Sequence, residues 1–114
     1  MVYSSQKYKL KYAPEVLAEL RAIKVYILEL SQSEKIANKR IDDMIEGISI
    51  LKTFPEVGFN ADEKYGRKFS KNTTTRGITL KKDYLVLYDI DEENLVVNIN
   101  YLFSTKSDYM RLFK

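Results

Sequence analysis

Two kinds of hydrophobic pattern divide the first half of the chain into a strand and two helices. In residues 7–12, aromatic and aliphatic side chains alternate with lysines, which is typical of a strand with one buried face. In residues 14–30, apolar side chains recur every three or four positions and predict a helix that begins at Pro14. A second apolar stripe, in residues 37–51, predicts another helix, which Pro55 brings to an end.

The connection between the predicted helices is very short. Ser31 and Glu34 have the S-x-x-E spacing of a capping box, so we expect the second helix to begin there. So short a connection predicts an antiparallel helical hairpin. Gly47 costs the second helix on the order of 1 kcal/mol relative to alanine, and a close helix crossing is the expected reason for it.

Residues 55–75 combine Pro55, two glycines and a threonine run with little periodicity, so we expect a long irregular segment there. Three strands are predicted after it, in residues 76–80, 84–88 and 95–103, and residues 108–113 are expected to form a final helical turn. The resulting order, β-α-α-β-β-β, predicts an α+β fold in which a helical hairpin packs on a mainly antiparallel sheet. We expect residues 1–114 to form a single domain.

Composition excludes several kinds of chemistry. The chain has no cysteine and no histidine, so disulfides, Cys/His zinc sites and Ser-His-Asp triads are ruled out. The acidic residues at 89–93 lack the spacing of a calcium loop, and no nucleotide-binding glycine motif occurs, so we expect no metal and no cofactor. The hydrophobic fraction of 45% is that of a globular protein, without an apolar run long enough to span a bilayer. The N-terminal residues do not resemble a signal peptide, and a cytoplasmic protein without a membrane partner is expected.

Positive charge is concentrated in one segment. Residues 64–82 hold seven Lys/Arg and no Asp/Glu, although the formal net charge of the whole chain is only +3. This segment is interpreted either as a solvated loop and hairpin or as a surface that binds a polyanion. Arginine and lysine can hold phosphates, and the nine tyrosines include candidates for base stacking or proton transfer.

The order of these elements and two sequence segments resemble the RelE/ParE superfamily, the toxins of type II toxin–antitoxin modules. The segments are FPEVG after the second helix and RGITLKKDYLVLYDIDEENLVVNINYLF, which begins at Arg76. Within the second segment, residues 84–91 have the pattern Y-x-V/I-x-Y-x-I/V-D. The tail STKSDYMRLF is similar to the last segment of the family, and the resemblance covers roughly residues 7–113.

The resemblance implies a growth inhibitor that a cognate antitoxin keeps silent. RelE-like members cleave mRNA on the ribosome without a metal, whereas ParE-like members poison DNA gyrase and are not nucleases. The chain departs from both patterns, since Leu80 stands where RelE-like members have an arginine and no histidine occurs near Phe103. The long helical hairpin is more ParE-like, but the basic segment favours RNA. We therefore expect ribosome-associated mRNA cleavage, with gyrase poisoning as the alternative and a non-catalytic nucleic-acid-binding module as a third possibility.

For a nuclease, Arg76 is expected to stabilise charge on the scissile phosphate, with a structural arginine paired to Asp89 as the alternative. The candidate catalytic residues are Arg76, Lys81, Lys106 and Tyr109. The candidate residues for holding nucleic acid are Lys64, Arg67, Lys68, Lys71 and Lys82. The antitoxin is expected to cover the sheet and the helical hairpin with an amphipathic helix or an acidic strand, burying more than about 1,000 Å².

Overall fold

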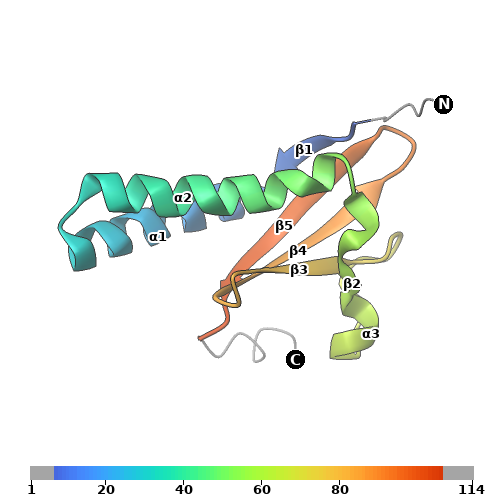
Figure 1. Ribbon diagram of the computed structural model, residues 1–114. Coiled ribbons are helices and arrows are strands. Elements are labelled where there is room, and N and C mark those ends of the chain that lie inside the picture. Colours follow the sequence, from blue (N-terminus) through green and yellow to red (C-terminus); the bar gives the residue numbers. More distant parts are fainter. Residues whose placement is uncertain (1–6, 107–114) are drawn as a thin grey trace.

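A computed structural model describes residues 7–106, in which a helical hairpin lies across one face of a five-stranded sheet (Figure 1). The helices are α1 (Pro14–Ser31), α2 (Glu34–Ser49) and the short α3 (Ala61–Tyr65). The strands are β1 (Lys9–Tyr12), β2 (Phe59–Asn60), β3 (Arg76–Leu80), β4 (Tyr84–Asp91) and β5 (Val96–Ser104). One-turn 3₁₀ helices at Ile50–Lys52 and Pro55–Val57 follow α2. The predicted α+β fold is confirmed.

The strands are arranged in the order β1-β5-β4-β3-β2. The N-terminal strand β1 runs parallel to β5, and the remaining neighbours are antiparallel. The pairs β3–β4 and β4–β5 form the predicted meander, which places β4 in the middle of the sheet. This central position explains why four consecutive residues of β4, Leu85 to Tyr88, are buried.

The helical hairpin begins and turns close to where the sequence predicted, but its cap differs. Helix α1 extends to Ser31, and the side chain of Ser33 accepts a hydrogen bond of 3.2 Å from the Ile36 N–H at the start of α2. The expected capping box at Ser31 and Glu34 was therefore wrong by two residues. The reason is that Gln32 adopts a left-handed conformation and closes α1, which moves the N-cap to the next available serine.

The main core lies between the hairpin and one face of the sheet. Apolar residues of α1 and α2 pack there against alternate residues of the strands, and Ala37, Ile48, Val86 and Ile99 are completely buried. A smaller cluster on the opposite face joins Leu85 and Leu87 to α3. The two helices and the sheet thus bury the first face thoroughly, whereas the second face is covered only at one end.

Gly47 was expected at a close crossing of helices, and the structure corrects this. A Cβ at this position would approach within 3.0 Å of the Leu80 Cδ2, so the close neighbour of Gly47 is the end of β3. The glycine lets α2 approach the sheet at this point.

Residues 55–75 are less irregular than expected, since they contain β2 and α3. Both elements are very short, and hydrophobic periodicity cannot detect elements of two and five residues. Asn60 caps α3 by accepting a hydrogen bond from Glu63 N–H, and Gly66 ends it with a φ of 67°. The final helical turn expected in residues 108–113 lies outside the described residues.

Candidate functional site

Arg76, the first candidate, binds the backbone of the turn that follows α2. Its Nη1 donates to the carbonyl of Gly58 at 3.1 Å and to that of Glu56 at 3.4 Å. Asp89, the alternative partner considered from the sequence, instead accepts hydrogen bonds from Asn98 and Asn100. The guanidinium therefore holds residues 56–58 against the start of β3.

Tyr88 holds the same turn from inside the core. Its hydroxyl donates to the carbonyl of Pro55 at 2.6 Å and accepts from the Gly58 N–H at 3.0 Å, and its side chain is completely buried. Burial raises the pKa of Tyr88, so the hydroxyl stays protonated and keeps its role as a donor. A Cβ at Gly58 would collide with the Tyr88 hydroxyl and with the Gly77 carbonyl. The FPEVG segment thus contains a glycine because the turn lies directly on the sheet.

Three basic candidates meet at the far end of β3, around the hairpin to β4. Lys81 Nζ lies 3.6 Å from Asp43 Oδ2 of α2, and Lys106 Nζ lies 4.0 Å from Asp83 Oδ1. Thr105 donates through Oγ1 to the carbonyl of Lys82 at 2.6 Å, which joins the end of β5 to this turn. The structure therefore brings the three lysines together.

The turn that carries two of these lysines has an unusual backbone. Lys81 and Lys82 have φ angles of 51° and 67°. This left-handed region costs a residue with a Cβ roughly 1–2 kcal/mol, and hairpin turns of this kind favour Asn-Gly. Both lysines thus adopt this backbone conformation at an energetic cost, and their side chains are exposed.

Arg76 is separated from this lysine group by the length of β3. The strand has five residues, so its two ends are about 13–16 Å apart at roughly 3.3 Å per residue. Tyr109, the fourth catalytic candidate, lies outside the described residues. The catalytic role of all four residues stays a prediction.

The remaining basic candidates lie on or after α3, beside the second, partly covered face of the sheet. Lys64 Nζ lies 4.7 Å from the centre of the Phe59 ring, and the Arg67 guanidinium lies 5.0 Å from that of Phe69. Lys68 and Lys71 are exposed on the loop that follows. The rings beside Lys64 and Arg67 belong to a row of aromatic contacts that runs from Phe59 to Phe103 and includes Tyr101, which is 43% exposed and stacked on Phe103.

Asp62 organises this basic loop and was missed by sequence reasoning. Its two carboxylate oxygens accept hydrogen bonds of 3.2 Å from the N–H groups of Phe69 and Thr75, and its carbonyl accepts from Arg67 N–H at 3.1 Å. The only signal in the sequence is an aspartate two residues after an asparagine that can cap a helix. The Asp62 carboxylate thus holds the loop that carries Arg67, Lys68 and Lys71 at Phe69 and Thr75, and the Asp62 carbonyl holds its start.

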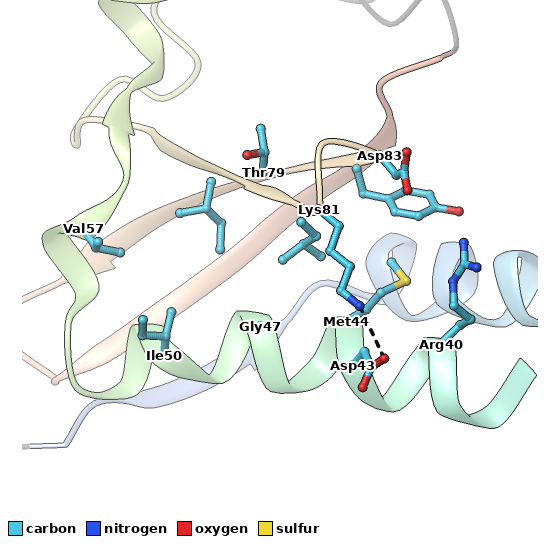
Figure 2. Close-up of a pocket in the computed structure, with 12 residues that line it drawn as sticks. Arg40, Asp43, Met44, Gly47, Ile50, Val57, Thr79, Lys81 and Asp83 are labelled. Atoms are coloured by element: carbon cyan, nitrogen blue, oxygen red, sulfur yellow. Dashed lines mark ion pairs between the residues drawn. The ribbon is translucent and has the colours of Figure 1, made fainter. Parts of the chain in front are cut away.

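A groove of about 350 Å³ lies between α2 and β3 (Figure 2). Its walls are mainly apolar and its charged residues lie at one end, where the ion pair between Lys81 and Asp43 joins the hairpin to the helix. The residues that line the groove include Met44, Gly47, Ile50, Val57, Ile78, Thr79 and Leu80.

In residues 7–106, no group of three or more carboxylate residues is arranged to hold a metal ion. No helix in this part of the chain is both long and apolar enough to cross a bilayer.

Comparison with solved structures identifies the class of fold. The chain is similar to a protein of the chromosomal ParDE toxin–antitoxin system from P. aeruginosa, with a TM-score of 0.68 and 18% identity over 90% of this chain and 100% of that one. It is also similar to a chain of the archaeal RelE–RelB complex from Pyrococcus horikoshii OT3, with a TM-score of 0.56 and 17% identity over 88% and 97% of the two chains. At these identities the likeness establishes the fold, which is that of the RelE/ParE toxins.

The sequence itself then identifies the family. The model of the ParE toxin of the type II toxin–antitoxin system parDE matches residues 10–109. The chain belongs to this family of toxins. Among individual curated proteins, none matches it.

Proposed function

We propose that this toxin arrests growth as a poison of DNA gyrase and does not cleave RNA. The observation that carries the proposal is the separation of its cationic candidates. Arg76 is engaged with two backbone carbonyls, whereas Lys81 and Lys106 lie at the opposite end of β3, each near an aspartate. The match to the ParE family model and the long helical hairpin support the same choice.

The physical argument concerns the geometry of a metal-independent ribonuclease. Attack by a ribose 2′-hydroxyl needs a base, an acid and a cation around one phosphodiester, each within about 3 Å of the atom on which it acts. Among residues 7–106, Arg76 and the lysines at the β3–β4 hairpin are too far apart to meet one phosphate in this way. A surface that acts by binding a protein needs no such convergence.

A type II toxin is also expected to have a protein partner that silences it. Of the two similar structures, one is described as a ParDE toxin–antitoxin system and the other as a RelE–RelB complex. We propose that a cognate antitoxin binds this chain and prevents its action.

Induced expression with parallel measurement of DNA and protein synthesis tests the proposed target. DNA synthesis should fall first, with double-strand breaks, and purified toxin should make gyrase linearise supercoiled plasmid in vitro. Early loss of translation together with cleaved mRNA on ribosomes would overturn the proposal. A variant of gyrase selected for resistance should restore growth, which links the arrest to that enzyme.

One observation favours ribosome-associated mRNA cleavage as a second candidate. Lys64 and Arg67 lie over aromatic rings on the second sheet face, and the exposed Tyr101 could stack on a base. This candidate predicts that Tyr101→Ala and Lys64→Ala abolish growth arrest through loss of mRNA cleavage. Unchanged arrest in both variants would exclude this surface from the action of the toxin.

A further inference from the structure

The closed end of the helical hairpin, where α1 passes into α2, extends beyond the sheet. Figure 1 shows this end projecting past the strands, so the sheet covers the two helices over only part of their length. The last buried residue of α1 is Ile27, and three residues later Leu30 is 69% exposed. This is the largest exposed fraction among the large apolar side chains of residues 7–106. The end of the hairpin therefore carries apolar surface that the sheet does not cover.

A second groove, the hairpin groove, has a volume of about 670 Å³ and lies between this end of the helices and the adjacent end of the sheet. Tyr26 and Leu30, four positions apart on one face of α1, line it together with Ile36 of α2. These three side chains are 60%, 69% and 48% exposed. Single exposed apolar residues are ordinary, whereas a contiguous apolar patch beside a groove is typical of an interaction site.

The charges that line the hairpin groove are balanced. Glu19 and Asp83 are acidic, and Arg40 and Lys106 are basic. Lys106 Nζ lies 4.0 Å from Asp83 Oδ1, so these two charges offset each other within the chain. Among residues 7–106, neither Glu19 nor Arg40 has an ion-pair partner. The hairpin groove therefore offers a partner one acidic and one basic side chain beside an apolar patch.

We propose that two copies of this chain associate through their hairpin grooves, so that the ends of the two hairpins form a four-helix arrangement. In a two-fold contact each patch meets a copy of itself, so it must carry both signs of charge. The hairpin groove meets this condition through Glu19 and Arg40. A partner of a single sign would instead place a like charge near one of them. The second hairpin also supplies the covering layer that the sheet does not provide at this end.

The proposal is independent of the target of the toxin. It concerns the assembly of the free chain and needs neither gyrase nor an antitoxin, so its failure would leave the proposed function untouched. The hairpin groove adjoins the groove between α2 and β3 at Arg40 and Asp83, which line both. The measurements therefore use the full chain alone, made by cell-free synthesis, so that no antitoxin occupies either groove.

Two substitutions on α1 test the contact by sedimentation equilibrium. Leu30→Glu places a charge in the apolar patch, and Val25→Glu is the matched control, because Val25 is 54% exposed and does not line the hairpin groove. The wild type should sediment as a dimer that dissociates on dilution. Leu30→Glu should weaken the association by at least about 100-fold, since the change occurs twice in a two-fold contact, whereas Val25→Glu should associate like the wild type. Equal association of the two folded variants would overturn the proposal.

Spin labels test which ends of the two copies meet. The chain has no cysteine, so Glu29→Cys and Glu93→Cys each give a single labelling site. Glu29 is exposed near the closed end of the hairpin, and Glu93 is exposed in the turn between β4 and β5, at the opposite end of the molecule (Figure 1). The distance between labels of the two copies should be short for Glu29→Cys and much longer for Glu93→Cys. The reverse order would overturn the proposal.

Thermal melting provides a control for folding and a further readout. The melting temperature of the wild type should rise with protein concentration, and that of Leu30→Glu should not, because only an associating chain is stabilised by mass action. A wild type that is monomeric at every concentration would overturn the proposal. Loss of antitoxin binding in Leu30→Glu would then assign the hairpin groove to the antitoxin, and a lower melting temperature of that monomer would assign it to residues of the same chain.

Discussion

The backbone N–H of Gly58 donates a 3.0 Å hydrogen bond to the hydroxyl of Tyr88, thirty positions further along the chain. The same hydroxyl donates to the carbonyl of Pro55, and the Arg76 guanidinium donates to the carbonyl of Gly58. The turn after α2 is therefore held by a buried tyrosine and a half-buried arginine. This relationship gives Arg76 a structural task that can be measured separately from any role in toxicity.

Replacing Arg76 by alanine should destabilise the protein. The change removes both bonds to the carbonyls of Glu56 and Gly58, and hydrogen bonds made by a charged group contribute about 1.5–3 kcal/mol when well formed. Because the site is partly exposed and one bond is long, we expect about 1 kcal/mol, or a melting temperature lower by about 4–8 °C. Differential scanning calorimetry measures this shift.

Growth arrest by the same variant separates the two roles of Arg76. Toxicity that falls only in proportion to the folded fraction supports the structural role. Complete loss of toxicity in a variant that melts like the wild type would instead support a direct role in binding phosphate. Arg76→Lys serves as the control, since it keeps the charge but lacks the planar fork.

Tyr88→Phe should also weaken the turn, and by more than a surface substitution. It removes the hydroxyl that serves both Pro55 and Gly58, and leaving such buried groups without a partner costs about 1–3 kcal/mol. Urea unfolding should show a lower midpoint with a similar slope. The matched control is Tyr26→Phe, at a tyrosine that is 60% exposed, for which a change below about 0.5 kcal/mol is expected. Equal effects of the two changes would contradict the assigned role of Tyr88.

Stability should decrease at alkaline pH. Burial raises the pKa of both Tyr88 and Tyr12 in the folded state, and among the described residues the Tyr12 hydroxyl has no hydrogen-bond partner. Because the folded-state pKa is raised, the protonated tyrosine contributes to the free energy of unfolding. This contribution is complete below the ordinary tyrosine pKa near 10, and it is lost as the pH rises through the higher folded-state pKa. Unfolding free energies measured from about pH 8 to 11 should show this decline. In Tyr88→Phe the decline should be smaller, and an identical decline would contradict the assignment.

Asp62→Ala should loosen the basic loop while leaving the main core folded. The carboxylate accepts from the N–H groups of Phe69 and Thr75, so its loss releases the loop at these two positions, whereas the bond from Arg67 N–H to the Asp62 carbonyl remains. We expect faster amide hydrogen exchange in this loop and faster tryptic cleavage at Lys68 and Lys71, whereas exchange in β4 should change little. The neighbouring Glu63→Gln is the control, because its side chain is exposed and the substitution leaves its backbone N–H bond to Asn60 in place. Similar cleavage rates in both variants would argue against the role given to Asp62.

The sequence alone determined the elements that depend on local pattern. Alternation in residues 7–12, the three- and four-residue spacing of the helices and the apolar run of β4 each correspond to an element in the structure. These patterns are reliable because they report which face of an element is buried, and each is repeated over several residues. The short connection at Gln32 then made an antiparallel hairpin unavoidable. The resemblance to the RelE/ParE toxins followed from the order and spacing of the same segments.

The tertiary structure alone decided what the charged and polar side chains do. Arg76 could have bound Asp89 or a phosphate, and its actual partners are carbonyls 18 and 20 residues earlier in the chain. The cap at Ser33, the closeness of Gly47 to Leu80 and the exposure of Leu30 depend in the same way on which segments meet. A polar group can bond several partners with similar energy, and the packing of the whole core determines which of them lies within reach. Hydrophobic periodicity carries no information about that choice, so the turn at Gly58 and the groove beside β3 emerge only when the chain is folded.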